Sequence, residues 1–251
     1  MTEIKAVFFD QDGVIIDTER DGHRVAFNQT FKEMGYDFEW SVEEYHELLQ
    51  VAGGKERMRH YLHTKGFGQE IAPEEEDELI KKMHKIKTDA FINLIESRSL
   101  PLRPGVHRIM KEANDLGLTL GVCTTSNERA AKAVTQGMLN DIKFDFVLAG
   151  DVVQKKKPNP EIYLLAMEKS GHNPEECVVF EDSHNGVSAA KAAGMNVVAT
   201  TNPYTESEDL SQADVIVNCL GDSDGEKAEV RKGDLDAQGV VTLKQLIDYF
   251  K

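Results

Sequence analysis

Six short runs of β-branched and aromatic residues constrain the fold of this chain most strongly. They are the segments 6–9, 118–123, 144–149, 177–181, 196–200 and 214–218. Each run is apolar almost throughout and lacks the polar alternation of a strand with a face in water. Such runs are typical of parallel strands that are covered on both faces, and helical patterns separate them. The sequence therefore predicts an α/β fold with a Rossmann-like, doubly wound parallel sheet.

Glycine, proline and capping residues mark the ends of the helices between these runs. Asn159 is the expected N-cap of a helix at 159–170, and Pro160 occupies its first helical position. Gly171 lies just beyond its end. Further helices are predicted at 104–116, 185–193 and 241–250, and the polar segment 221–239 is predicted as a solvated loop.

The stretch 18–98 interrupts this rhythm, because it shows helical periodicity and no convincing strand. Its clearest helix, at 78–95, has an apolar stripe at Leu79, Met83, Ile86, Ala90 and Leu94. The acidic run 73–78 begins with proline and suits a helix start, where negative charge is favourable, better than a metal site. We therefore expect an α/β core made of 1–17 and 99–251, with an all-helical cap domain inserted at 18–98.

The chain of 251 residues carries 44 acidic and 29 basic residues, a formal net charge of −15. This balance argues against nucleic acid and anionic membranes as partners. No transmembrane run or signal peptide is apparent, so we expect a cytoplasmic protein, or a stromal one if a plant or alga processes it. The three cysteines have no metal or redox spacing, and Cys123 and Cys177 are expected to be buried thiols. A monomer is the default expectation.

Asp10 and Asp12 lie directly after the first predicted strand, where an open α/β sheet binds its ligands. Residues two apart on an extended segment point to the same side. Two carboxylates this close resist ionising together, and a divalent cation such as Mg²⁺ would relieve the repulsion. The alternative is a pair of turn acids that only cap the strand.

Polar side chains also follow three further predicted strands. Hydroxyl and amide groups follow the second strand, at Thr124, Thr125, Ser126 and Asn127. Together with the next helix they suit either phosphate binding or ordinary helix capping. Lys157, held extended before a proline, could neutralise a phosphoryl group. Glu181 and Asp182 end the fourth strand and suit metal ligation.

These four strand-end motifs, in this order, resemble those of the haloacid dehalogenase superfamily, and the resemblance covers nearly the whole chain. It implies a phosphatase in which Asp10 attacks phosphorus to form an aspartyl-phosphate, while Asp12 protonates the leaving group and then activates water. Thr124 and Lys157 would contact the phosphate. The implied Mg²⁺ ligands are Asp10, Asp12 (through its backbone carbonyl) and Asp182, with Glu181 in support.

Three cations at 55–59 stand out in this acidic chain. If a helix begins after Gly54, Lys55 and Arg57 lie in its first turn, where the helix dipole disfavours positive charge. A phosphate bound there would remove the conflict, because dipole, backbone N–H groups and cations would all favour it. The alternative is a set of solvated cations, and Arg59 is expected at the surface.

Several passages further resemble the CbbY group, phosphatases of xylulose-1,5-bisphosphate, an inhibitor of Rubisco. They include GGKERM (53–58), MHKIKT (83–88), LPLRPGV (100–106) and FEDSHNGVSAAKAAGM (180–195). The resemblance implies that Glu19 touches the substrate and that the cap binds its second phosphate. The implied cap residues are Gly53, Gly54, Lys55, Glu56 and Arg57, with His84 and Lys87 nearby. Lys87 falls on the apolar stripe, so it either reaches the helix edge or faces an enclosed anion, and His84 lies at the margin of that stripe.

The expected function is thus a Mg²⁺-dependent sugar bisphosphate phosphatase whose partner is a small sugar phosphate. Dehalogenases of the same superfamily lack the second Asp and the metal pair, so Asp12 and Asp182 argue against dehalogenation. A β-phosphoglucomutase-like sugar phosphomutase would share the core and a similar cap. A non-catalytic sugar-phosphate-binding regulator is a further alternative, against which the complete set of motif residues argues.

Overall fold

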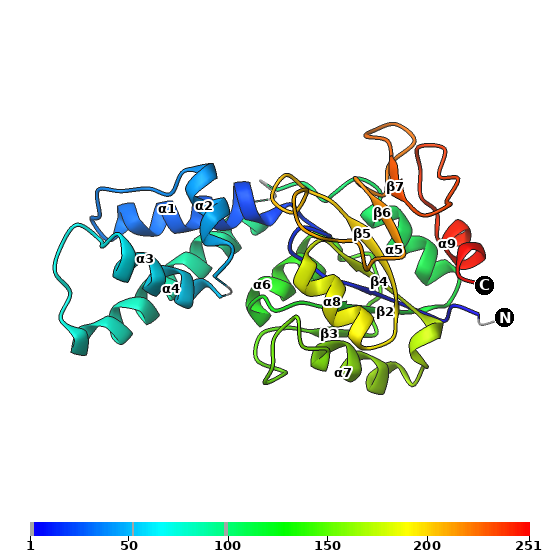
Figure 1. Cartoon of the computed structure of the whole chain (residues 1–251), viewed down its shortest axis with the longest axis horizontal. Helices are drawn as coiled ribbons and strands as arrows, with labels where there is room; N and C mark the ends of the chain where they lie inside the picture. Colours follow the sequence, from blue (N-terminus) through cyan, green and yellow to red (C-terminus); the bar gives the residue numbers. More distant parts are fainter. Residues whose placement is uncertain (1–2, 52, 98–99) are drawn as a thin grey trace. The chain divides into compact units, whose positions relative to one another are not determined.

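The computed structural model describes residues 3–51, 53–97 and 100–251, which form two compact units (Figure 1). The core unit combines the segment up to Asp17 with the segment from Pro101 onward, and the cap unit runs from Thr18 to Leu100. Residues 98 and 99, where the second domain boundary was expected, lie outside the described residues.

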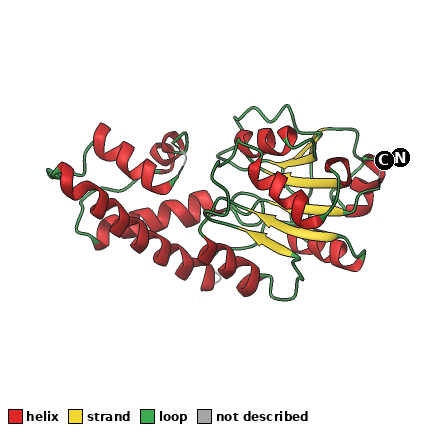
Figure 2. Ribbon diagram, turned by 90° about the horizontal axis from the view of Figure 1, so that it is seen from below, coloured by secondary structure: helices red, strands yellow, loops and turns green. Residues whose placement is uncertain are grey.

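A seven-stranded sheet in the order β3-β2-β1-β4-β5-β6-β7 forms the centre of the core unit, with helices on both of its faces (Figure 2). The strands are β1 (Ala6–Phe9), β2 (Thr119–Cys123), β3 (Phe146–Leu148), β4 (Cys177–Glu181), β5 (Asn196–Thr200), β6 (Val215–Val217) and β7 (Val230–Lys232). β1 to β6 pair in parallel, which confirms the six predicted strands and the doubly wound sheet. Most side chains of β1, β2, β4 and β5 are fully buried, as their continuous apolar runs require.

Strand β7 contradicts the prediction of a loop over the whole of 221–239. It pairs antiparallel with β6 at the edge of the sheet. Arg231 and Lys232 are both exposed, and the strand has no apolar run by which it could be identified. Edge strands are held by backbone hydrogen bonds, which every non-proline residue can make, and sequence pattern reveals them poorly.

The helices α5, α7, α8 and α9 of the core unit lie within a few residues of their predicted bounds, and α6 follows Asn127. They are α5 (Val106–Asp115), α6 (Glu128–Lys132), α7 (Glu161–Ser170), α8 (His184–Ala192) and α9 (Leu243–Tyr249), with a π-helix at Ala133–Met138 and a 3₁₀ turn at Pro174–Glu176. The N-cap of α7 is Pro160, one residue later than predicted, although Asn159 Oδ1 still accepts a hydrogen bond from the Glu161 backbone N–H at 3.2 Å.

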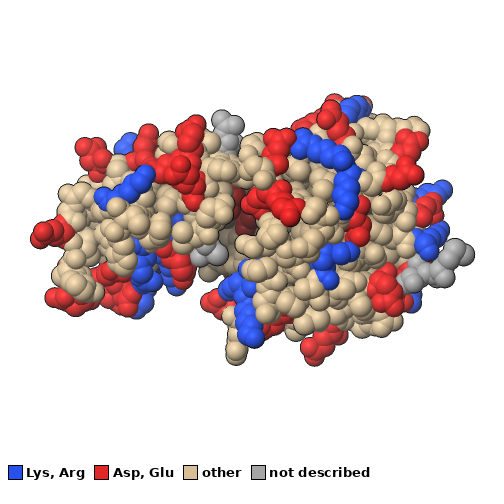
Figure 3. All heavy atoms as spheres, viewed as in Figure 1, with Lys and Arg blue, Asp and Glu red and all other residues tan. Residues whose placement is uncertain are grey.

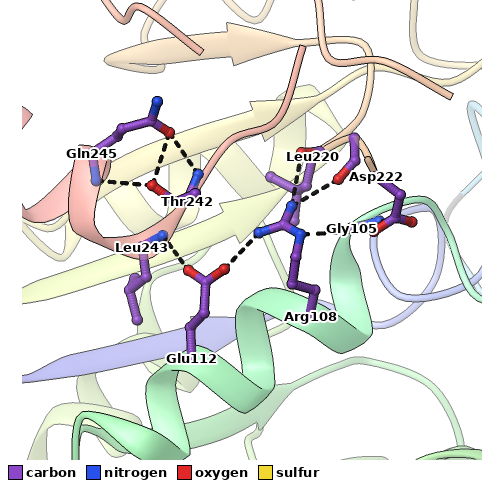
Figure 4. A network of polar contacts seen from close by, with 9 residues as sticks. Gly105, Arg108, Glu112, Leu220, Asp222, Thr242, Leu243 and Gln245 are labelled. Carbon is purple, nitrogen blue, oxygen red and sulfur yellow. Dashed lines mark hydrogen bonds and ion pairs between the residues drawn. The ribbon is translucent and has the colours of Figure 1, made fainter. Parts of the chain in front are cut away.

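A polar network ties the C-terminal helix α9 to α5 (Figure 4). Glu112 accepts from Arg108 at 2.7 Å and from the backbone N–H of Leu243 at 2.7 Å. Arg108 also donates to the carbonyl oxygens of Leu220 and Gly221, and Asp222 accepts from the N–H of Gly105. The last helix is therefore anchored to the α5 side of the core unit.

Helices are the only regular elements among the described residues of the cap unit. Its elements are a π-helix at Glu19–His23, α1 (Arg24–Glu33), α2 (Val42–Leu48), α3 (Gly54–Thr64) and α4 (Pro73–Glu96). An aromatic cluster forms its core, with Trp40 in ring contact with Phe27, Phe31, Tyr45 and Tyr61. α4 begins at Pro73, as predicted, and α3 begins at Gly54, one residue before the start expected from the sequence.

The buried face of α4 differs from the predicted stripe. Met83 and Ala90 are buried as expected, but Leu79, Ile86 and Leu94 are only half-buried. The residues that complete the buried face are Ile80, Lys87, Phe91, Ile92 and Ile95. Because α4 packs against both α1 and α3, the buried surface is wider than a single stripe and rotated from it.

The surface view shows acidic and basic side chains interspersed (Figure 3). Within the cap unit, Arg59 pairs with Glu76 at 2.7 Å and with Asp77 at 2.6 Å, and its side chain is partly exposed, as predicted. Among the described residues, no helix combines the length and apolarity needed to cross a membrane.

Candidate active site

The polar residues that follow β1, β2 and β4 meet at one edge of the sheet. Phe9 is in register with Val122 of β2 and with Phe180 of β4, so these central strands end side by side. Asp10 continues the ladder by donating its backbone N–H to the carbonyl of Phe180 at 2.9 Å. The parallel topology thus brings together residues that are more than 100 positions apart in the sequence.

Lys157 is the cationic centre of this cluster. Its Nζ lies 2.6 Å from Asp10 Oδ1, 2.6 Å from Glu181 Oε1 and 3.0 Å from the carbonyl oxygen of Cys123. Burial opposes the charge, but Asp10 and Glu181 outweigh it and raise the pKa of the Lys157 ammonium above its ordinary value. Lys157 is therefore held as a cation against two carboxylates.

Three buried carboxylates, those of Asp10, Glu181 and Asp182, offer oxygen atoms that all lie within 4.8 Å of one another. Burial, together with Glu181 and Asp12, raises the pKa of Asp10 to about 7, although Lys157 opposes the shift. Burial and the neighbouring Asp10 and Glu181 also raise the pKa of Asp182 well above its ordinary value. One lysine does not balance three carboxylates, so this oxygen-rich cluster fits a divalent cation such as Mg²⁺.

Two glycines make room for these carboxylates. Gly13 has a φ of +83°, and a Cβ atom there would overlap the carboxylate of Asp182. A Cβ atom at Gly186, in the first turn of α8, would overlap the carboxylate of Glu181. Both positions therefore require glycine for close approach to the acidic cluster.

Asp12 and the residues after β2 lie beside this cluster. The side chain of Asp12 is half-buried and accepts a hydrogen bond from Ser126 Oγ, so it lies outside the group of three carboxylates. Thr124 is buried, and its Oγ1 accepts from the backbone N–H of Ser126 at 3.0 Å. Thr125 and Asn127 are exposed, and Asn127 caps the short helix α6 by accepting from Arg129 N at 2.9 Å.

Three residues outside the predicted set complete the core site. Tyr163, in α7, donates its hydroxyl to Glu181. Arg103 donates to the carbonyl oxygen of Gly13 and, at 2.6 Å, to that of Thr201. Asn202 donates to Asp182. A tyrosine on an apolar helix face carries no motif, but Asn202 lies two residues after a predicted strand, and a polar side chain near a strand end is a usable signal.

In the cap unit, the predicted residues of α3 gather around its first turn. Gly53 is the N-cap with a φ of +93°, and a Cβ atom there would overlap the side chain of Glu56. A Cβ atom on Gly54 would lie 3.3 Å from the imidazole of His84. Lys55 and Glu56 are exposed. The structure therefore places His84 of α4 against the start of α3.

Arg57 differs from its neighbours because it is buried. Its Nε donates to the carbonyl of Leu48 at 3.0 Å, and its Nη1 donates to the hydroxyl of Tyr45 at 2.9 Å. That hydroxyl donates in turn to Glu19 Oε2 at 2.6 Å. The residues Arg57 and Glu19, both expected to meet the substrate, are thus linked through Tyr45, which no motif indicated.

Lys87 is buried rather than extended to the helix edge. Its Nζ lies 2.8 Å from His23 Nδ1, and 4.9 Å and 5.1 Å from the ring centres of Phe27 and Phe91. Burial, followed by the charges of Lys87 and Lys55, lowers the pKa of His84 to about 4. His84 is therefore neutral at physiological pH, within a part of the cap that gathers positive charge.

Comparisons with known proteins agree with this geometry. Residues 4–194 match the family of haloacid dehalogenase-like hydrolases. The chain is 45% identical over 229 residues to a CBBY-like protein of Arabidopsis thaliana, covering 90% of this chain and 72% of that protein. It is 40% identical to the protein CbbY of Rhodobacter capsulatus, covering 84% and 92%. A mutant CbbY from Rhodobacter sphaeroides, solved in complex with xylulose-1,5-bisphosphate, is similar with a TM-score of 0.77 and 37% identity, covering 86% of this chain and 94% of that one.

Proposed function

Because the chain belongs to the haloacid dehalogenase-like hydrolases, as a phosphatase of the CbbY-like group, we propose that it hydrolyses a sugar bisphosphate with Mg²⁺ through an aspartyl-phosphate. The observation that carries the proposal is the cluster of three buried carboxylates, Asp10, Glu181 and Asp182, two of which, Asp10 and Glu181, pair with Lys157. It combines a candidate nucleophile, a cation for the phosphoryl oxygens and an oxygen-lined metal site.

The residues of the core would divide the chemistry as follows. Lys157 holds Oδ1 of Asp10, which leaves Oδ2 to attack phosphorus in line with the departing sugar oxygen. Asp12, outside the three-carboxylate group, protonates that oxygen and later takes a proton from the water that cleaves the aspartyl-phosphate. Ser126 orients the Asp12 carboxylate, and Thr124 donates to the phosphate.

Asp10 and Asp182, the Asp12 carbonyl and a supporting Glu181 would hold the Mg²⁺ ion. The bound ion supplies positive charge that offsets the negative charge of the transferred phosphoryl group. This role fits the raised pKa of Asp10, because a cation beside a buried carboxylate favours its ionised, nucleophilic form.

We further propose that the cap residues bind the phosphate that is not hydrolysed. The start of α3 offers backbone N–H groups behind two glycines together with Lys55, and buried Arg57 and Lys87 add positive charge. The substrate bound by the Rhodobacter sphaeroides relative supports xylulose-1,5-bisphosphate, which would yield xylulose 5-phosphate and phosphate. Glu19, held by Tyr45, would contact the sugar.

A phosphate-release screen over sugar mono- and bisphosphates, with and without Mg²⁺, tests this function. We expect the highest kcat/KM with xylulose-1,5-bisphosphate, loss of turnover without Mg²⁺, and a fall of roughly 10⁴-fold or more in Asp10→Asn. Lys156→Ala is the matched control, because Lys156 is exposed one position before Lys157. Retained turnover in Asp10→Asn would refute the aspartyl-phosphate, and an isomerised sugar phosphate without phosphate release would identify a mutase.

A further inference from the structure

Asn202 lies two residues beyond β5, next to the strand that carries Asp182. β4 and β5 pair in parallel with Glu181 in register with Ala199, so the segments that follow both strands lie side by side. Asn202 is buried, and its Nδ2 lies 2.7 Å from Asp182 Oδ2. The contact joins a buried amide directly to one of the three clustered carboxylates.

The turn after β5 determines which way this amide faces. Asn202 Oδ1 accepts hydrogen bonds from the backbone N–H groups of Tyr204 at 2.9 Å and Thr205 at 3.1 Å. The backbone N–H of Asn202 donates to Thr205 Oγ1 at 3.2 Å. Because the amide oxygen is needed at these N–H donors, the NH₂ group must face Asp182.

The surroundings leave this pair little freedom to move. A Cβ atom at Gly13 would overlap the Asp182 carboxylate and lie 2.9 Å from Asn202 Nδ2. Arg103 donates hydrogen bonds to the carbonyl oxygens of Gly13 and Thr201. It thereby links the turn that packs against Asp182 to the residue that precedes Asn202. The Asn202 amide is therefore held in one orientation, and the Asp182 carboxylate that accepts its hydrogen bond has little room to rotate.

We propose that Asn202 is a positioning residue for the metal site: its amide holds Asp182 by Oδ2 and so presents the carboxylate to Mg²⁺ in one orientation. The inference rests on the proposed function, because it takes Asp182 as a metal ligand. Hydrogen-bond partners of metal ligands fix ligand orientation, and their loss typically costs roughly 10–100-fold in metal affinity or activity.

The variant Asn202→Ser tests the bond to Asp182 separately from the hydrogen bonds of the turn. The serine hydroxyl can replace the acceptor for the turn N–H groups, but it is too short to reach Asp182. In calorimetric titration of the metal-free protein with Mg²⁺, we expect the Kd to rise roughly tenfold or more. At saturating Mg²⁺ the KM for the sugar phosphate should stay unchanged. Thr205→Val is the matched control, because it removes a turn hydrogen bond but keeps the amide, and it should retain the parent affinity.

A comparison with Asp182→Asn excludes a general loosening of the core. If Asn202 acts through Asp182, adding Asn202→Ser to Asp182→Asn should weaken Mg²⁺ binding no further. Equal Mg²⁺ affinity in Asn202→Ser and the parent overturns the proposal, as does equal weakening by Thr205→Val. If the unaltered chain binds no Mg²⁺, the proposed metal site itself fails, which is a different result.

Discussion

The core unit and the cap unit bury charges of opposite sign. In the core, three buried carboxylates cluster together, and two of them, Asp10 and Glu181, pair with the ammonium of Lys157. In the cap, the buried charged side chains among the described residues are Arg57 and Lys87, which contact a phenol, a backbone carbonyl and aromatic rings. Buried charge is costly unless it is compensated, so each excess indicates the ligand that it suits. The core suits a cation, and the cap suits an anion.

The largest effect on stability should follow removal of the core cation. Lys157→Met keeps much of the side-chain length but leaves Asp10 and Glu181 facing each other without an ammonium. Breaking a buried ion pair in this way typically costs about 3–5 kcal/mol. We expect a loss of that size in the free energy of unfolding of the metal-free protein, measured by urea denaturation, with partial recovery in Mg²⁺. The exposed control Lys156→Met should change the free energy of unfolding little. Equal losses of stability in the two variants would contradict the role of Lys157 as the cation that balances the buried carboxylates.

Acidification should stabilise the metal-free core. The pKa of Asp10 is raised from 3.8 to about 7 when the protein folds, with burial as the main cause. Between these values the folded state holds a proton that the unfolded state has lost. The free energy of unfolding should therefore rise as the pH falls from about 7 toward 4, by on the order of a few kcal/mol. Urea denaturation across this range measures the slope, and Asp10→Asn or added Mg²⁺ should flatten it. If stability depends on pH equally steeply in Asp10→Asn, a group other than Asp10 causes the dependence.

Removing cap cations should affect the two substrate classes differently. A hydrogen bond to a charged group contributes about 1.5–3 kcal/mol, or roughly 10–100-fold in kcat/KM. We expect Lys55→Ala to lose that much with the bisphosphate and little with a small monophosphate. Arg57→Ala should show the same selectivity and also lower stability, because Tyr45 and the Leu48 carbonyl lose their donor. Equal losses of kcat/KM with the bisphosphate and the monophosphate would contradict the proposal that the cap binds a phosphate.

The smallest effect should come from His84 and should have the opposite pH sign to that of Asp10. Burial and nearby cations lower its pKa to about 4, below the usual value of 6.5. The unfolded state therefore binds a proton first, and stability is lost as the pH falls from 6.5 toward 4. Because the side chain is partly exposed, we expect about 1 kcal/mol. The stability difference between His84→Asn and the parent should shift in favour of the variant on acidification, and a constant difference would exclude the linkage.

The core could be predicted largely from the sequence because its signals are local. Continuous apolar runs indicate buried parallel strands, and three of the four motifs follow or end such a run directly, while Lys157 lies in the loop after the third run. The topology of a parallel sheet then brings those residues to one edge. β7 escaped prediction because this short polar edge strand has no apolar run.

The side-chain partners could not be predicted, because they depend on how elements distant in the sequence pack. The sequence by itself determined which acids and cations are present and where on the strands and helices they lie. Only the tertiary structure decided that Lys157 would balance Asp10 and Glu181, that Tyr45 would join Arg57 to Glu19, and that Asn202 would hold Asp182. These contacts are set by burial and close packing, which no periodicity in the chain records.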